Sequence, residues 1–212
     1  MMKISEMFAS IQGESTLQGI PSVFIRLAGC NLYCRYCDTT YARSGGTEMT
    51  VEEIIDKVKS FELSFVCITG GEPLLQKETP ELAGKLVGSG YKVSVETNGT
   101  IDASSLPDNV KRIIDIKCPG SGEDGKTFMK NISLRRNGDE FKFVITGRED
   151  FEYARHFVSK HNLADIHTVL FSPVLDVLNP ELLADWILHE MPEARLNLQL
   201  HKYIWPNEKK GR

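Results

Sequence analysis

Three cysteines stand close together in the segment LAGCNLYCRYCDTTYA, which covers residues 27–42. They are Cys30, Cys34 and Cys37, in the spacing Cys-x3-Cys-x2-Cys, out of five cysteines in the chain. A structural zinc site usually takes four tetrahedral ligands arranged as two pairs. The other two cysteines do not supply a second pair, because Cys67 lies inside an apolar run and Cys118 stands alone.

An iron–sulfur cube suits three clustered thiolates better than a structural zinc ion does. Four irons occupy corners of such a cube, and cysteine thiolates hold them. Three thiolates therefore leave one iron open to bind a further ligand. An open zinc site with three cysteine ligands stays as an alternative interpretation of this segment.

The segment ITGGEP, residues 68–73, is a second candidate for a binding loop. Gly70 and Gly71 let the backbone approach a ligand closely, since glycine has no Cβ. This segment ends the apolar run FVCITG, and the cysteine segment follows the apolar run SVFIRLAG. Both loops are therefore expected at the carboxyl ends of strands.

Short apolar runs alternate with amphipathic stretches along the chain, which is typical of a parallel sheet. Thr50 with Glu53 predicts a capping box, and Thr79 and Asn179 each precede a proline and are predicted helix caps. We expect helices over 51–61, 81–89, 149–161 and 181–191. We expect strands over 22–29, 65–70, 91–96, 112–117, 140–145, 167–172 and 195–200.

Several of these expected strands carry polar residues on one face only. Strands of a parallel sheet are buried on both faces and tend to be apolar throughout. Here Arg26, Glu96, Asp115, Lys117 and Lys142 alternate with apolar neighbours. We interpret this as a barrel or part-barrel whose interior holds a polar ligand at the carboxyl ends of the strands. Solvated edge strands are the alternative.

The composition indicates an ordinary globular protein, with 41% hydrophobic and 25% charged residues among 212. The net charge of −4 argues against a protein built mainly to hold nucleic acid. No apolar run is long enough to span a bilayer, and the N-terminus lacks the apolar core of a secretion signal. We therefore expect a cytoplasmic protein with reduced thiols, and the odd number of cysteines does not suggest a disulfide framework.

The segments CNLYCRYC and ITGGEP, in this order, resemble the cluster-binding and SAM-binding motifs of the radical S-adenosylmethionine (SAM) superfamily. The resemblance implies a [4Fe-4S] cluster whose open iron binds the amino and carboxylate groups of SAM. It also implies one-electron cleavage of SAM to a 5′-deoxyadenosyl radical, which abstracts a hydrogen atom. The implied fold class is α/β, a modified, incomplete (β/α) barrel of the radical SAM type with mostly parallel strands, as a single domain over residues 1–212.

The same resemblance assigns residues to the cofactors. It places Tyr36 beside the adenine of SAM and lets Glu72 accept hydrogen bonds from the ammonium group. The segments ETNG (96–99), DIKCP (115–119) and FSPV (171–174) resemble further SAM-contacting positions. The implied cluster ligands are Cys30, Cys34 and Cys37, and the implied SAM-binding residues are Tyr36, Cys37, Asp38, Glu72, Gly99, Lys117, Cys118, Pro119 and Ser172.

The segments FASIQGEST (8–16) and NLQLHKYIWP (197–206), with RLAGCNLYCRYCDT between them, resemble the 7-carboxy-7-deazaguanine synthase family over nearly the whole chain. The resemblance implies conversion of 6-carboxy-5,6,7,8-tetrahydropterin to 7-carboxy-7-deazaguanine with loss of ammonia, for 7-deazapurines including queuosine of tRNA. It also implies Mg²⁺, a homodimer, and an electron donor such as flavodoxin or ferredoxin. No contact with a membrane and no direct contact with nucleic acid are expected.

The family resemblance also assigns the substrate. Arg26 would clasp the substrate carboxylate with its planar fork, unless it pairs with an interior acid such as Glu96. Glu14 would accept hydrogen bonds from the pterin N–H groups, and the Thr39 hydroxyl would contact Mg²⁺. The implied substrate-binding residues are Ile11, Gln12, Gly13, Glu14, Arg26, Thr97 and Pro206.

The C-terminal segment departs from the family pattern. In some members a C-terminal proline presents its carboxylate to the substrate, whereas here NEKKGR follows Pro206 and ties that carboxylate into a peptide bond. Two other functions share part of the pattern: a glycyl-radical-enzyme activase, and a zinc or iron–sulfur binding module without catalysis. The QGE segment and QLHKYIWP favour the small-molecule enzyme, and a binding module would not need the glycine motif.

Overall fold

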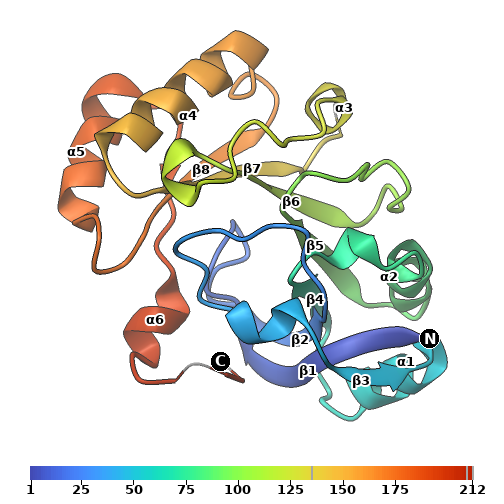
Figure 1. The fold of residues 1–212 in the computed structure, drawn as a ribbon. Helices are drawn as coiled ribbons and strands as arrows, with labels where there is room; N and C mark the ends of the chain where they lie inside the picture. Colours follow the sequence, from blue (N-terminus) through green and yellow to red (C-terminus); the bar gives the residue numbers. More distant parts are fainter. Residues whose placement is uncertain (135, 209, 212) are drawn as a thin grey trace.

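A curved nine-stranded sheet organises the described part of the chain, residues 1–134, 136–208 and 210–211, in this computed structural model (Figure 1). The strand order is β3-β1-β2-β4-β5-β6-β7-β8-β9. The strands from β2 through β9 in this order are parallel, and β1 runs antiparallel to both β2 and β3. The edge strands β3 and β9 do not pair with each other, so the sheet does not close. The predicted incomplete barrel with mostly parallel strands is therefore confirmed.

The bounds of the elements follow the predicted alternation of strand and helix. The strands are β1 Met2–Ile11, β2 Pro21–Leu27, β3 Thr47–Met49, β4 Phe65–Gly70, β5 Lys92–Thr97, β6 Lys111–Ile116, β7 Glu140–Ile145, β8 Thr168–Pro173 and β9 Arg195–Leu196. The α-helices are α1 Val51–Lys59, α2 Thr79–Gly88, α3 Lys130–Ser133, α4 Arg148–His161, α5 Pro180–Glu190 and α6 Leu200–Ile204. The 3-10 turns are η1 Thr40–Arg43, η2 Pro73–Leu75 and η3 Pro119–Ser121.

Two of the three predicted helix caps are confirmed. Thr50 and Glu53 form the complete capping box of α1, and the Asn179 side chain accepts a hydrogen bond from the backbone N–H of Glu181. The cap predicted at Thr79 is wrong, because α2 begins at that residue after Glu78. The Thr79 hydroxyl instead donates to the carbonyl of Pro73 at 2.6 Å, which ties α2 to the preceding turn.

Three parts of the sheet differ from the sequence prediction. The strands β1 and β3 were not expected, although Met2 and Ile4 alternate with exposed Lys3 in β1. The strand expected over 195–200 ends at Leu196, because the Asn197 side chain turns inward and bonds to Ser15. The chain then forms α6, which lies at the open side of the sheet (Figure 1).

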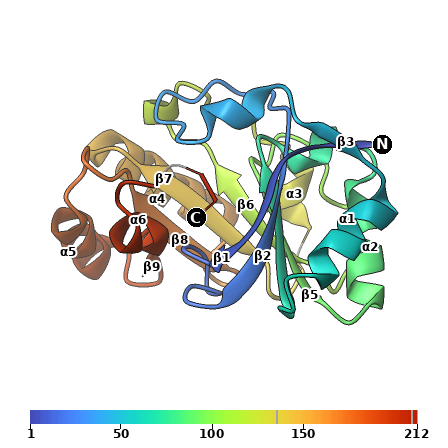
Figure 2. The ribbon, with the colours of Figure 1, turned by 90° about the horizontal axis from the view of Figure 1, so that it is seen from below.

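The alternation of apolar and polar residues along the strands is confirmed as a division between an outer and an inner face. Apolar side chains of β2, β4 and β5 pack with α1 and α2, and those of β6, β7 and β8 pack with α4 and α5. Figure 2 shows these two helix pairs at opposite ends of the curved sheet. The inner face carries the polar side chains, so the alternative of solvated edge strands is wrong. In the described residues no helix is both long and apolar enough to cross a membrane.

One charged pair lies on the outer face, away from the interior. Arg112 on β6 is fully buried, and its Nε donates to Asp139 Oδ1 at 2.9 Å while its Nη2 bonds to the other carboxylate oxygen. The guanidinium also reaches the carbonyl oxygens of Ala103 and Leu134. The pair therefore connects the loops on both sides of β6.

We expect Arg112→Ala to lower the free energy of unfolding by about 3–5 kcal/mol, because removing one partner leaves a buried, uncompensated carboxylate. Urea denaturation with a constant m-value would measure this. The matched control is Lys59→Ala, whose exposed pair with Asp56 should contribute within about 0.5 kcal/mol. Equal stabilities for the two variants would contradict a structural role for Arg112.

Candidate active site

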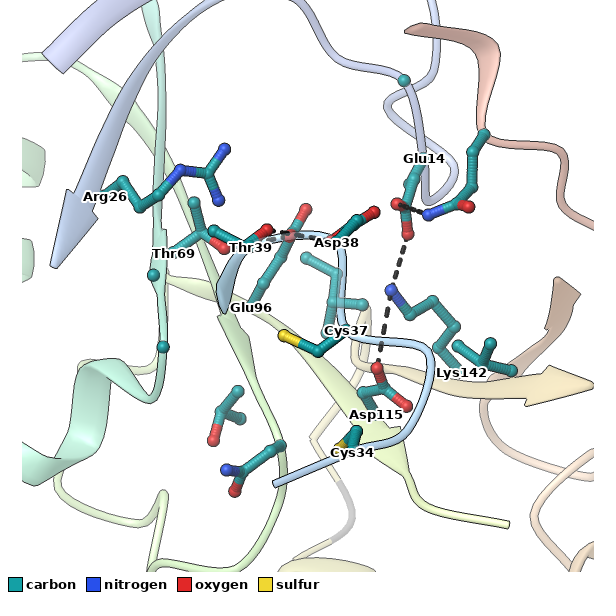
Figure 3. A pocket seen from close by; sticks show the side chains of 18 of the residues that line it. Glu14, Arg26, Cys34, Cys37, Asp38, Thr39, Thr69, Glu96, Asp115 and Lys142 are labelled. Carbon is teal, nitrogen blue, oxygen red and sulfur yellow. Dashed lines mark hydrogen bonds and ion pairs between the residues drawn. The ribbon is translucent and has the colours of Figure 1, made fainter. Parts of the chain in front are cut away.

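A pocket lies at the carboxyl ends of β2, β4, β5, β6 and β7, on the inner face of the sheet (Figure 3). Its wall is completed by the loop after β1, by the cysteine segment after β2, and by residues 199–202 at the start of α6. Carboxyl ends of parallel strands are where ligands bind in such sheets, because the loops there project from one edge. The two ends of the chain therefore meet over this edge.

The cysteine segment forms one wall of the pocket. Cys30, Cys34 and Cys37 all line it as free, partly buried thiols. The segment is held by backbone hydrogen bonds, from Gly29 N–H to the carbonyl of Ala42 at 2.8 Å and from Arg35 N–H to that of Ser121 at 3.0 Å. Burial raises the pKa of the Cys34 thiol, and the charge of Lys117 opposes this shift.

The three thiols lie along one wall of the pocket. In the described residues no three Cys, His, Asp or Glu side chains converge as one metal ion would require. A tetrahedral zinc ion would draw its ligands to about 2.0–2.3 Å from one point. An iron–sulfur cube spreads its cysteine ligands over separate irons, so three thiols along one wall suit it.

The glycine loop is packed directly against the cysteine segment. A Cβ at Gly70, which has φ +151°, would lie 2.3 Å from the carbonyl oxygen of Leu27. A Cβ at Gly71 would lie 2.1 Å from the carbonyl oxygen of Gly29 and 2.7 Å from Cys30 Cβ. The backbone of the cysteine segment packs so closely here that neither position has room for a Cβ. This packing fixes the position of Cys30.

Paired charges line the rest of the pocket. Lys142 Nζ lies 2.6 Å from Glu14 Oε2 and 3.7 Å from Asp115 Oδ2 (Figure 3). Burial raises the pKa of Glu14, but the charges of Lys142 and His201 and hydrogen bonds from Lys142 and Gln199 lower it to about 2. Glu14 is therefore an ionised acceptor at neutral pH.

Three buried polar atoms of the pocket residues have no hydrogen-bond partner in the described part of the chain. They are Asp115 Oδ1, the hydroxyl oxygen of Tyr36 and Arg43 Nε. A buried polar atom without a partner costs free energy. Such atoms in a pocket wall point to a bound ligand that completes their hydrogen bonds.

The comparisons with known proteins agree with this geometry. The model of the radical SAM superfamily matches residues 24–181. The 7-carboxy-7-deazaguanine synthase of Koribacter versatilis is 42% identical over 99% of this chain and 100% of its own, and that of Chlorobaculum tepidum is 42% identical over 99% and 97%. The chain belongs to the 7-carboxy-7-deazaguanine synthase family of radical SAM proteins. Membership of this superfamily implies a [4Fe-4S] cluster and SAM.

Solved structures share the fold of this synthase family member. QueE from Escherichia coli superposes with a TM-score of 0.79 at 23% identity, covering 94% of each chain. Streptococcus suis SuiB bound to S-adenosylmethionine superposes with a TM-score of 0.54 at 16% identity, covering 80% of this chain and 44% of that one. The synthase relatives favour the small-molecule enzyme over the activase and the binding module.

The structure brings together most residues that the family resemblance assigned. The pocket is lined by the predicted Ile11, Gln12, Gly13, Glu14, Arg26, Thr97, Cys30, Cys34, Tyr36, Cys37, Asp38, Thr39 and Lys117. Arg26 does form an ion pair, but its partner is Glu6 at 2.6 Å rather than Glu96. The Tyr41 hydroxyl donates to the same Glu6 oxygen at 2.7 Å.

Glu72, a predicted SAM contact, is not among the residues that line the pocket. Its side chain is fully buried. It accepts hydrogen bonds from Asn98 N–H at 2.6 Å, Leu74 N–H at 2.9 Å and the Thr97 hydroxyl at 2.8 Å. Burial raises the pKa of Glu72, and these bonds oppose the shift. The carboxylate therefore joins the glycine loop to the end of β5, and its contact with the SAM ammonium stays a prediction.

Five other predicted residues also lie outside the pocket lining. Cys118 is buried in the apolar cluster beneath α4, and Pro119 opens the 3-10 turn that follows it. The buried Ser172 hydroxyl donates to Asn197 at 3.3 Å. Gly99 packs against Ile114, with Asn98 facing the pocket instead. Pro206 is exposed beyond α6.

Some pocket residues were absent from the predicted site. Asp115, Lys142 and Glu96 were expected on the inner face but received no role, although their alternation with apolar neighbours was the available signal. Gln199, His201 and Lys202 lie in QLHKYIWP, which was used only for the resemblance. Glu6, the partner of the pocket residue Arg26, lies in the unpredicted β1, and no local signal marks it.

We expect Gly71→Ala to reduce the iron bound per chain after anaerobic reconstitution, because the added methyl group displaces Gly29 and Cys30. Iron analysis and the visible spectrum would measure this. The matched control is Gly88→Ala in α2, where a Cβ meets nothing within 4 Å. Equal iron content in the two variants would contradict the close packing of the two loops.

Proposed function

We propose that this chain is a 7-carboxy-7-deazaguanine synthase. It converts 6-carboxy-5,6,7,8-tetrahydropterin to 7-carboxy-7-deazaguanine with loss of ammonia, a step toward 7-deazapurines such as queuosine. The observation that carries the proposal is that the three thiols and the substrate residues assigned by the family line one pocket, in a chain whose relatives bear that name. The cluster would be held by Cys30, Cys34 and Cys37, and with SAM it supplies hydrogen-atom abstraction.

Arg26 binds the substrate carboxylate in this proposal. Its Nε donates to Glu6, and in the described residues no hydrogen bond engages its two terminal nitrogens. Those nitrogens form one edge of the planar fork, which suits a carboxylate in a bidentate contact. Glu6 and Tyr41 thus orient the guanidinium before substrate arrives.

Glu14 binds the opposite end of the substrate. A carboxylate only accepts hydrogen bonds, so it suits the N–H groups of the pterin edge. The Lys142 ammonium and the Gln199 amide hold its two oxygens, at 2.6 Å and 2.7 Å. Because these contacts are already made, binding costs little further ordering of the side chain.

Mg²⁺ would be held by the Thr39 hydroxyl together with an oxygen of the substrate carboxylate. Mg²⁺ prefers oxygen ligands and keeps several waters. The Thr39 hydroxyl lies in the pocket and donates to Asp38 at 2.9 Å, and Lys202 Nζ lies 2.8 Å from Asp38. These contacts support a fixed position for Thr39.

The remaining parts of the proposal concern the cellular setting. The protein acts as a single-domain homodimer in the cytoplasm and takes electrons from a flavodoxin or ferredoxin. The exposure of Tyr33 and Arg35 on the cysteine segment supports access for such a donor. The tail beyond Pro206 turns back, with Lys210 Nζ 4.6 Å from the centre of the Tyr41 ring. Pro206 is not proposed as a substrate contact.

The function is tested by anaerobic incubation of the reconstituted protein with SAM, dithionite, Mg²⁺ and the tetrahydropterin acid, followed by mass spectrometry. We expect 7-carboxy-7-deazaguanine and an equal amount of ammonia. Omitting Mg²⁺ should lower the rate. Cleavage of SAM without this product would instead favour the activase, and absence of any SAM cleavage would favour a binding module.

We expect Arg26→Ala to lower kcat/KM by the equivalent of about 2–5 kcal/mol, mainly through KM, because the substrate carboxylate loses its charged partner. Steady-state kinetics would measure the change. Arg26→Lys keeps the charge without the planar fork and should recover part of the loss. The Glu6→Gln control removes only the orienting carboxylate and should cost less. An unchanged KM in Arg26→Ala would remove Arg26 from the substrate site.

A further inference from the structure

The acidic side chains at the pocket are paired with cations, except for one. Four of them have a partner nitrogen at 2.6–2.9 Å: Glu6 with Arg26, Glu14 with Lys142, Asp115 with Lys117, and Asp38 with Lys202. Glu96 is the exception, since in the described part of the chain no Lys, Arg or His nitrogen lies within 4.0 Å of its carboxylate. Glu96 therefore differs from the other four acidic residues in having no cation beside its carboxylate.

Glu96 is held by neutral donors alone. The Gln12 amide donates to its Oε1 at 3.2 Å, and the Thr69 hydroxyl donates to its Oε2 at 3.2 Å. Both distances lie at the long end of the hydrogen-bond range. The strand β5 brings the carboxylate to the pocket directly before Thr97. It is thus fixed in position but not neutralised.

The surroundings of Glu96 favour its protonated form more than those of Glu14 do. Burial raises the pKa of Glu96, and the nearby charge of Glu14 raises it further. Lys142, Arg26 and the Gln12 amide oppose the shift without cancelling it, and the Cys67 thiol on β4 is a neutral neighbour whose pKa burial raises well above its usual value. Two carboxylates in one pocket with pKa values shifted in opposite directions are typical of an acid–base site.

The proposed reaction requires one proton to leave carbon and one to reach nitrogen. The tetrahydropterin ring contains one more nitrogen than the aromatic five-membered ring of the product. As ammonia departs, a C–H bond breaks on the ring carbon next to the carbon that carries the departing nitrogen. Its electron pair becomes the ring double bond, and the electrons of the C–N bond stay with nitrogen, which takes up a proton. The step is balanced without an oxidant or reductant.

We propose that Glu96 is the catalytic acid–base residue of this elimination, accepting the ring-carbon proton and returning a proton to the departing nitrogen. The inference rests on the proposed function. Arg26 and Glu14, which bind the two ends of the substrate, lie on either side of Glu96 (Figure 3). The ring between those ends therefore passes the Glu96 carboxylate. A carboxylate paired with lysine holds its charge and returns a proton less readily.

The test compares the same substitution at both glutamates in the full-length, cluster-loaded enzyme. We expect Glu96→Gln to lower kcat roughly 10²- to 10⁴-fold, the usual contribution of a general acid–base group, with little change in KM. Transfer of deuterium from labelled substrate into 5′-deoxyadenosine should persist, while ammonia release falls with product formation. Glu14→Gln should act mainly on KM. Glu96→Asp keeps a carboxyl group and should recover part of the rate.

A second measurement does not depend on the cluster or on turnover. In protein labelled with ¹³C at the glutamate carboxyl carbon, the Glu96 signal is the one that is missing from the spectrum of Glu96→Gln or of Glu96→Asp. We expect this signal to titrate above the ordinary glutamate pKa, while the Glu14 signal titrates far below it. This titration decides the question if Glu96→Gln does not fold.

Three results would overturn the inference. The first is a Glu96 carboxyl that titrates at or below the ordinary glutamate pKa. A second is a Glu96→Gln variant that releases ammonia at the wild-type rate while the wild type makes the product, and this leaves the proposed function intact. If the wild type converts none of the tetrahydropterin acid, the proposed function and this inference fail together.

Discussion

The charged interior of the curved sheet is the constraint on which the rest of the structure depends. A charge enclosed by protein is unstable unless it is paired or hydrogen-bonded. Lys142 on β7 is therefore paired with Glu14 from the loop after β1, and Arg26 on β2 with Glu6 on β1. Each partner comes from a segment outside the run of parallel strands. The N-terminal strand thus belongs to the binding site as much as to the sheet.

Close backbone contact is the second constraint, and it sets the position of the cysteine segment. Gly71 N–H donates to the carbonyl of Leu27 at 3.2 Å, and Glu72 N–H donates to that of Gly29 at 2.8 Å. Because Glu72 also accepts a hydrogen bond from the Asn98 backbone, the loops after β2, β4 and β5 are linked to one another. Backbone packing therefore fixes where the cysteine segment begins.

The sequence predicts the inner face well, because side chains of a strand alternate between its faces and Arg26, Glu96 and Lys142 repeat that alternation. It predicts the thiols because their spacing is local. It does not predict β1, whose role follows from pairing with β2, nor the partner Glu6. The burial of Glu72 is not predicted, for the same reason. Its burial depends on donors of Leu74, Thr97 and Asn98 that meet only in the folded chain.

The wall of the pocket is built from two segments far apart in the chain, one with Gln12 and Glu14 and one with Gln199, His201 and Lys202. The two segments touch, since the Gln199 amide donates to Glu14 at 2.7 Å. A ribosome makes the first of these segments well before the second. The strands between them can pair while the chain is still growing, but the pocket stays open until Lys202 has left the exit tunnel. Metal and substrate therefore meet a finished site only after translation has passed that residue.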